Sequence, residues 1–267
     1  MMTFGKRLWL LVLLVILGLC LTAGLSLVVG RAVPDPTRAV RITMIAQMLL
    51  AFILPAVVMA LFVTRLPAEF LMIKQKPCGR EFGLALLTLL VSIPAMNCLV
   101  ELFQQLPWPQ SVLDGEAQAQ AAVTTLMGPH TIPNFIASLL IMSLLTGLSE
   151  ELLFRGALMR TLHTRPMPAW GAVWMAAMFF SFMHFQPVGF VPRLLLGAYL
   201  GYVTLWSGSL WTAIACHALN NAIVVTALYL KVPENFVGLQ TPLLSGASLC
   251  LTVMLLWGMW RCRVRED

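Results

Sequence analysis

Charged residues are scarce in this chain. Asp, Glu, Lys and Arg make up 10% of its 267 residues, whereas apolar residues make up 60%. A typical soluble domain is about half apolar and about a quarter charged. The composition therefore argues against a soluble core and indicates a protein that crosses a membrane several times. The net charge of +6 does not indicate nucleic-acid binding, because the Lys and Arg residues lie between apolar runs, as they do in membrane proteins.

Motifs of several enzyme classes are also missing. The sequence has six cysteines but no Cys-x-x-Cys pair, so we expect small core residues rather than a disulfide framework or a metal cage. It has no His-Glu-x-x-His, the usual zinc-binding helix motif. It also lacks Gly-x-Gly-Asp and Gly-x-Ser-Gly, which argues against an intramembrane aspartyl protease and against a rhomboid-type serine nucleophile.

What the sequence does have is eight apolar runs, each close to the roughly 20 residues that a helix needs to cross a bilayer. We predict an all-α membrane protein with about eight transmembrane helices in one bundle. The first run is longer than the roughly 7–15 apolar residues of a secretory signal, so we expect an uncleaved helix there. The expected helices lie at residues 8–30, 42–64, 82–100, 133–160, 169–187, 190–207, 210–230 and 242–260.

Three regions divide this predicted bundle. Residues 1–131 hold the first three helices and an extramembrane loop, at residues 101–131, in which we expect a short interfacial helix. Residues 132–230 form the expected catalytic core, and residues 231–267 hold the last helix and a basic tail. The positive-inside rule favours an orientation with both termini in the cytoplasm, because most Lys and Arg residues then lie on the inner side. In a bacterium this would be the plasma (inner) membrane.

A charged cluster, Ser-Glu-Glu-Leu-Leu-Phe-Arg-Gly from Ser149 to Gly156, lies inside the fourth apolar run. Charges at membrane depth cost about 2.5–3.5 kcal/mol each on insertion scales, so they are usually paired and functional. Glu151 and Arg155 are four residues apart and can form an ion pair on one helix face. Glu150 points about 100° away, toward a cavity where it can act as a general base for water. The alternative is an ion-paired strut that locks two helices together.

Two histidines occur in later apolar runs. His184 follows Phe180 by four residues, and His217 precedes Asn221 by four, so each pair shares a helix face. His217 and Asn221 can donate hydrogen bonds to a developing oxyanion. Each of these residues alone is as well explained by a hydrogen bond between helices. Together with the charged cluster, however, two His in separate apolar runs favour hydrolytic chemistry.

These motifs resemble those of the CAAX protease and bacteriocin-processing (CPBP, or Abi) family of intramembrane proteases. They follow the order of that family over residues 133–230, and the count of eight helices agrees with it. The family pattern Glu-Glu-x-x-x-Arg, Phe-x-x-x-His and His-x-x-x-Asn stands here as Glu150-Glu151 to Arg155, Phe180 to His184, and His217 to Asn221.

The resemblance implies hydrolysis of a peptide bond without a covalent enzyme intermediate. Glu150, with His184, would activate a water molecule. His217 and Asn221 would stabilise the tetrahedral oxyanion. Glu151 and Arg155 would position the site and balance its charge. The expected partners are a peptide or protein substrate and the lipid bilayer.

The resemblance leaves the role of a metal open. If zinc is bound, Glu150, His184 and His217 are its candidate ligands, and zinc would also lower the pKa of a bound water. We favour a mechanism that requires no cofactor, because Asn221 is a poor zinc ligand but a good oxyanion donor.

Two other classes of function compete with the protease. A non-catalytic membrane scaffold or bacteriocin self-immunity protein would keep the fold and would not need Glu150. A proton-coupled transporter would use the carboxylates and histidines as a proton relay. Transporters are often built from repeated halves; the sequence shows no such repeat, which disfavours this class.

Overall fold

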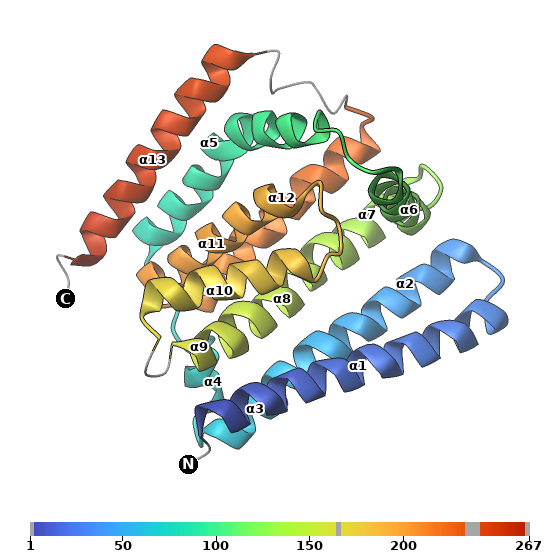
Figure 1. The fold of residues 1–267 in the computed structure, drawn as a ribbon, viewed down its shortest axis with the longest axis horizontal. Coiled ribbons are helices and arrows are strands. Elements are labelled where there is room, and N and C mark those ends of the chain that lie inside the picture. Colours follow the sequence, from blue (N-terminus) through green and yellow to red (C-terminus); the bar gives the residue numbers. More distant parts are fainter. Residues whose placement is uncertain (1–2, 164–166, 233–240, 265–267) are drawn as a thin grey trace.

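Eight helical segments correspond to the predicted apolar runs, and no strand is found in the part of the chain that the structure describes (Figure 1). The computed structural model describes residues 3–163, 167–232 and 241–264. It confirms the predicted all-helical bundle of about eight helices. The segments are α1 (Phe4–Ala32); α2 (Pro36–Gln47), continued by η1 (Met48–Ile53) and α3 (Leu54–Val63); α5 (Gly79–Gln104); α7 (Ile132–Ser138), continued by η2 (Leu139–Leu145), α8 (Thr146–Glu151), η3 (Leu152–Met159) and α9 (Arg160–Leu162); α10 (Ala169–Phe182); α11 (Phe190–Ser207); α12 (Leu210–Tyr229); and α13 (Pro242–Val264).

The connections between these segments contain two further helices, α4 (Pro67–Phe70) and α6 (Gln110–Met127). The start of α1 and the end of α13 lie at the same end of the bundle (Figure 1), as an even number of crossings requires. Of the predicted C-terminal region, residues 233–240 and 265–267 lie outside the described residues.

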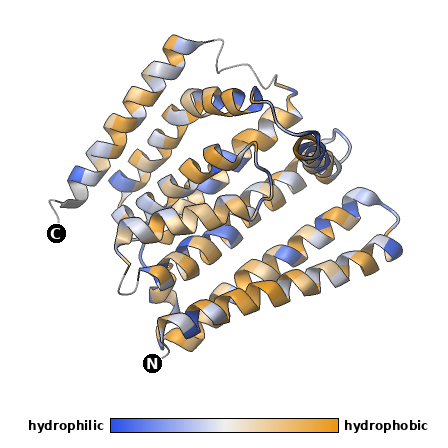
Figure 2. Cartoon of the chain, viewed as in Figure 1, coloured by the Kyte–Doolittle hydropathy of each residue, from blue (hydrophilic) through white to orange (hydrophobic). Residues whose placement is uncertain are grey.

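The outer surface of the bundle is apolar. Six helical segments are long and apolar enough to cross a membrane, and α10 is a shorter apolar helix. Large side chains such as Trp9, Phe62 and Met254 are about two-thirds exposed, and Figure 2 shows apolar residues along most of α1 and α3. So much exposed apolar surface marks a protein that contacts lipid. The chain is an integral, multi-pass membrane protein.

Three π-helical stretches, η1, η2 and η3, interrupt the second and fourth long segments. Pro55 gives a reason for η1, because proline has no N–H and its ring clashes with the carbonyl four residues earlier. The wider turn is seen in the hydrogen bond from Leu54 N–H to Leu49 O, which spans five residues instead of four. Such stretches are rare and are often found at functional sites.

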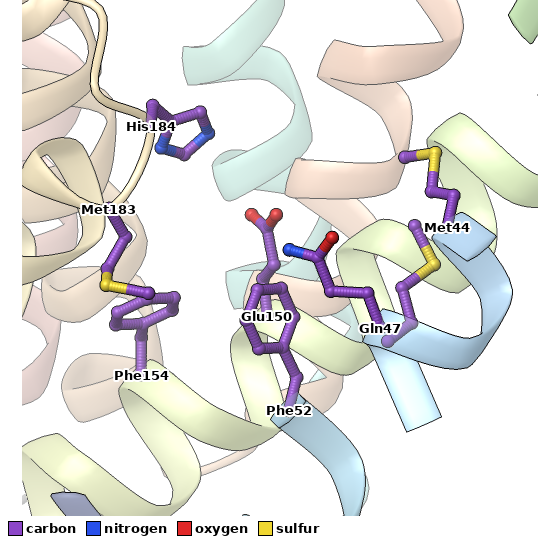
Figure 3. Close-up of a pocket in the computed structure, with 8 residues that line it drawn as sticks. Met44, Gln47, Phe52, Glu150, Phe154, Met183 and His184 are labelled. Carbon is purple, nitrogen blue, oxygen red and sulfur yellow. The ribbon is translucent and has the colours of Figure 1, made fainter. Parts of the chain in front are cut away.

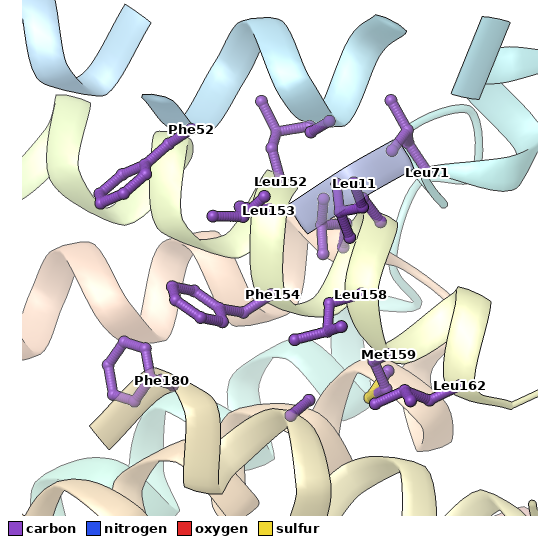
Figure 4. Close-up of a cluster of buried hydrophobic side chains, with 14 of the residues drawn as sticks. Leu11, Phe52, Leu71, Leu152, Leu153, Phe154, Leu158, Met159, Leu162 and Phe180 are labelled. Atoms are coloured by element: carbon purple, nitrogen blue, oxygen red, sulfur yellow. The ribbon is translucent and has the colours of Figure 1, made fainter. Parts of the chain in front are cut away.

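A buried apolar cluster joins the first two segments to the fourth and to α10 (Figure 4). Three aromatic rings cross it in edge-to-face contact: the centroids of Phe52 and Phe154 are 6.4 Å apart, and those of Phe154 and Phe180 are 5.3 Å apart. Rings packed in this way contribute about 0.5–1.5 kcal/mol beyond the area that they bury. They also fix the turn of the fourth segment that carries the charged cluster.

Small residues bring α11 close to α10. A Cβ atom on Gly197 would lie 3.0 Å from the Cβ of Ala177, and one on Gly201 would lie 2.8 Å from a methyl carbon of Val173. Small residues at this four-residue spacing allow close packing of membrane helices. The close approach also brings the carbonyl oxygen of Gly197 within reach of the fourth segment.

The loop predicted at residues 101–131 contains a longer helix than expected. Helix α6 has 18 residues, packs against α2 and α7, and runs across the other helices (Figure 1). Arg41 fixes it there by donating to the carbonyl oxygens of Leu126 and Met127, at 3.0 Å each, and to Asn134 Oδ1 at 2.9 Å. Arg41 is therefore an internal clamp and does not report the orientation in the membrane.

The cysteines are free thiols in the described chain, as expected, but most are not core residues. Cys216 is buried and Cys98 is partly buried, whereas Cys20, Cys78 and Cys250 are exposed. The prediction of core positions was wrong for these three. Cys20 and Cys250 lie on outward-facing sides of α1 and α13, and Cys78 lies in the connection just before α5. The side chain of Cys262 lies outside the described residues.

Candidate active site

Glu151 lies at the centre of a buried polar cluster. Its Oε1 accepts from Arg155 Nη1 at 2.5 Å, and His217 Nδ1 lies 2.7 Å from the same oxygen. The side chains of Glu151 and Arg155 are fully buried, and that of His217 is 4% exposed. The ion pair expected from the four-residue spacing is thus present. It also holds α12 against the fourth segment.

Arg155 has further partners that make its burial tolerable. Its Nη2 donates to the carbonyl oxygen of Gly197 at 2.9 Å, and its guanidinium carbon lies 4.7 Å from the centre of the Phe180 ring. A buried ion pair offsets its desolvation cost only if additional hydrogen bonds satisfy the charged groups. The close packing of α11 described above supplies one of these hydrogen bonds.

Glu150 lies in a different environment from its neighbour. It lines a cavity of about 140 Å³, together with His184 and otherwise mostly apolar side chains (Figure 3). Glu150 Oε2 lies 3.7 Å from His217 Nε2, which is too far for a hydrogen bond. The cavity has room for a few water molecules, since each occupies about 30 Å³ in the liquid. The carboxylate is therefore free to bind a water molecule.

The predicted fifth helix, residues 169–187, would place His184 late in its crossing and toward the face opposite Glu150, but His184 lies on the same cavity as Glu150. The cause is the length of α10, which ends at Phe182 after 14 residues. At 1.5 Å per residue this helix spans about 21 Å, so it stops short of a full crossing. The connection to α11 then places His184 beside Glu150.

The orientation of the His184 ring is set by its backbone. Its Nδ1 lies 2.8 Å from the carbonyl oxygen of Phe180, which can only accept, so Nδ1 carries the proton. In the neutral ring Nε2 is then an acceptor. His184 thus offers a lone pair to a water molecule in the cavity.

Asn221 lies one turn beyond His217 on α12, but it does not line the cavity. Its Nδ2 donates to the carbonyl oxygen of Met142 at 3.1 Å. Nearby, Ser143 donates to the carbonyl oxygen of Ala218 at 2.6 Å, and a Cβ on Gly147 would lie 3.0 Å from Ala218 N. These contacts join α12 closely to η2 and α8. The Asn221 amide has two N–H groups, and only one of them takes part in the hydrogen bond to Met142.

Gln47 is a polar cavity residue that the sequence reasoning missed. It is the last residue of α2, and its amide points toward the Glu150 carboxylate (Figure 3). Between Thr43 and Thr64 it is the only residue with a polar side chain. Polar residues within membrane segments are costly and usually functional, so this isolation was a usable signal.

In the described structure the candidate zinc ligands are not gathered around one point. Among the described residues, no three His, Cys, Asp or Glu side chains are placed to hold a metal ion together. His217 Nδ1 bonds Glu151 and His184 Nδ1 bonds Phe180 O, which leaves Nε2 of each ring available. Glu150, His184 and His217 thus lie in one region without a shared coordination centre, and the mechanism below uses the chain's own residues alone.

Comparison with protein-family models gives one finding. Residues 132–223 match the Rce1-like family, described as type II CAAX prenyl endopeptidase Rce1-like. The matched family is the CPBP family. The matched residues include all seven residues of the sequence motifs, whereas Gln47 lies outside them. Comparisons with curated proteins and with solved structures gave no match. The match supports a membrane-embedded protease in general.

Proposed function

We propose that this protein is an intramembrane endopeptidase of the CPBP type that hydrolyses a peptide bond of a membrane-associated or peptide substrate. The observation that carries the proposal is the contrast between two adjacent carboxylates. Glu151 is held by Arg155 and His217, whereas Glu150 faces a cavity that it shares with His184. A free carboxylate and an imidazole lone pair in one enclosed site are the groups that general-base hydrolysis requires.

In the proposed reaction, Glu150 removes a proton from a water molecule that His184 Nε2 helps to orient. The oxygen of this water then bonds to the carbonyl carbon of the scissile peptide and forms a tetrahedral intermediate. The C–N bond breaks as Glu150 returns the proton to the leaving nitrogen. The products are a carboxylate and an amine, and no covalent bond to the protein is formed.

The negative charge of the intermediate needs donors nearby. His217 Nε2 lies beside Glu150, and it can donate when the ring carries both protons. A doubly protonated His217 would also balance the charge of two glutamates and one arginine in a buried site, where an unbalanced charge is costly. Asn221 keeps one amide N–H beyond its bond to Met142, and we assign it to the same role.

In this proposal the partners are a peptide or protein substrate and the lipid bilayer, and no cofactor takes part. Both termini lie in the cytoplasm, and the substrate reaches the site from the bilayer or from the cytoplasmic side. The matched family acts on CAAX motifs by its description; whether a prenylated substrate is used here is decided by adding such peptides to the experiment below.

The test is peptide cleavage by the purified protein in detergent, with a proteome-derived peptide library. The wild type is compared with Glu150→Gln, and with Glu69→Gln as the matched control, since Glu69 pairs with Lys74 on the surface. We expect cleavage by the wild type and the control and none by Glu150→Gln, with or without a zinc chelator. Full activity of Glu150→Gln would exclude the proposed base. Cleavage that the chelator abolishes and zinc restores would show that a metal is required.

The scaffold alternative is tested by the same variants. A non-catalytic scaffold needs the buried Glu151 cluster but not the cavity-facing carboxylate. It therefore predicts no cleavage by the wild type and an unchanged cellular phenotype for Glu150→Gln. The protease predicts that this variant loses the phenotype while the protein remains folded.

A further inference from the structure

A second, larger cavity adjoins the one that holds Glu150. It has a volume of about 530 Å³ and lies between α1, α2, α6 and η2. Ligand pockets usually have about 300–1,000 Å³, so this groove can hold a segment of a polypeptide, whereas the 140 Å³ cavity holds little more than the reacting groups. We call this space the α2–α6 groove.

Two residues line both spaces, Met44 and Gln47. The α2–α6 groove therefore adjoins the cavity at the point where Gln47 faces Glu150. No charged residue lines the groove; its wall is formed mostly by small and apolar side chains such as Ala39, Ala122 and Val123. An uncharged, extended chain suits such a wall, because it buries apolar side chains and leaves no charge unpaired.

The groove is also held open in a fixed shape. Arg41, on α2, donates to the carbonyl oxygens of Leu126 and Met127 at the end of α6, so the two helices that face each other across the groove are clamped together. A preformed site loses less conformational freedom on binding than a flexible one. This is the behaviour expected of a binding site and not of a gap between loosely packed helices.

Gln47 lies at the junction with an amide that has no hydrogen-bond partner among the described residues. Of the side chains that line the cavity with Glu150, only Gln47 brings an N–H donor from the side opposite His184 (Figure 3). An amide N–H binds the carbonyl oxygen of a peptide, and the amide oxygen binds a peptide N–H. One Gln side chain can thus align a peptide bond over the Glu150 carboxylate.

We propose that Gln47 binds the scissile peptide through its amide and donates to the carbonyl oxygen, while an uncharged segment of the substrate next to that bond lies in the α2–α6 groove. This inference rests on the proposed protease function. It adds a substrate-binding residue from the second helical segment, outside the matched family core.

The first test measures kcat and KM with a fluorescence-quenched peptide chosen from those that the wild type cleaves in detergent. Gln47→Met keeps the length of the side chain and removes the donor, Gln47→Asn keeps the amide, and Gln120→Met, on the exposed face of α6, is the matched control. Losing one oxyanion donor typically lowers kcat by about 10²–10³-fold. We expect a fall of that order for Gln47→Met, a smaller one for Gln47→Asn and none for Gln120→Met.

The second test fills the groove. Ala122→Trp adds a large side chain to its wall, and Ala121→Trp adds the same side chain to the neighbouring position of α6, which does not line the groove. We expect KM to rise at least about tenfold for Ala122→Trp only, since an indole occupies the volume that the substrate needs.

The outcomes separate this inference from the function on which it rests. If the wild type cleaves and Glu150→Gln does not, but Gln47→Met and Ala122→Trp match their controls, the inference is wrong and the protease stands. If the wild type cleaves no peptide, both are overturned. If Gln47→Met has a lower midpoint of thermal unfolding than Gln120→Met, Gln47 has a structural role. If Gln47→Asn and Gln47→Met have equal kcat values, the amide has no part in binding the scissile peptide.

Discussion

Glu150 and Glu151 are adjacent in the sequence and differ in almost every physical respect. Glu151 is fully buried and shares one carboxylate oxygen between Arg155 and His217. The side chain of Glu150 is 13% exposed and lines a cavity, and its nearest ion-pair contact, His217 Nε2, is 3.7 Å away. Oε2 of each carboxylate has no hydrogen-bond partner among the described residues. A rotation of about 100° between neighbouring helix positions is enough to place one carboxylate in a salt bridge and the other on the cavity where we propose that catalysis occurs.

This contrast shows how a membrane protein can hold a reactive carboxylate. An unpaired charge in a low-dielectric interior is costly. In the proposed function a doubly protonated His217 balances the charge of Glu150, while Arg155 stays paired with Glu151. The stable pair and the reactive residue are thus parts of one arrangement, and substitutions can separate their contributions. The expected effects below run from the largest to the smallest.

Glu150→Gln should remove activity and leave stability almost unchanged. The substitution keeps the shape of the side chain and removes the base that accepts the proton from water. We expect cleavage to fall below detection, while the midpoint of thermal unfolding in detergent stays within a few degrees of the wild type. A large loss of stability would mean that Glu150 belongs to the structural cluster.

His184→Ala should lower kcat by about 10²–10⁴-fold, which is the usual contribution of an acid–base group. The ring lines the cavity but, through Nδ1, bonds only to the carbonyl oxygen of Phe180, so we expect little change in folding. His163→Ala, at an exposed position, is the control. Equal rates for the two variants would remove His184 from the mechanism.

Arg155→Ala should destabilise the protein by about 3–5 kcal/mol, because it leaves a buried carboxylate without its partner. Activity should be lost with the fold, as measured by the folded fraction in size-exclusion chromatography. Arg155→Lys should lie between the wild type and Arg155→Ala, since an ammonium cannot reach both Glu151 and the carbonyl oxygen of Gly197 in the same planar geometry. Arg80→Ala, at an exposed position, should have no effect.

Asn221→Leu distinguishes a structural role of Asn221, the hydrogen bond to Met142, from a catalytic role as an oxyanion donor. A hydrogen bond between membrane helices contributes about 0.6 kcal/mol on average, so a residue that only braces Met142 should lower stability slightly and leave kcat nearly unchanged. As an oxyanion donor it should also lower kcat by about tenfold or more. Asn97→Leu on α5, outside the site, is the control for the loss of an amide in a membrane helix.

The sequence was sufficient to predict the eight helical segments and the ion pair between Glu151 and Arg155. Long apolar runs specify membrane helices because a bilayer needs about 20 apolar residues per crossing, and this gave all eight segments. The spacing of Glu151 and Arg155 specified their ion pair, because residues four apart share a helix face. These features depend on local periodicity, which a sequence displays directly.

Other features depend on contacts between distant segments and could not be read in this way. The depth of His184 follows from where α10 ends, and Gln47 reaches the site only because α2 packs against the fourth segment. The exposed thiols show the same limit, since an apolar run does not tell which of its faces points to lipid. Asn221 shows that a motif spacing places a residue on a helix face without giving its partner.

The shortness of α10 has a consequence for the lipid around the protein. A helix of about 21 Å beside a hydrocarbon core of about 30 Å creates a hydrophobic mismatch, which a bilayer relieves by thinning locally at a cost of fractions of a kcal/mol per ångström. The thinned region of the bilayer would lie next to α10, where His184 follows the end of the helix. Water would then reach the site over a shorter path, and the acyl-chain length of the membrane would help to set how well the cavity is hydrated.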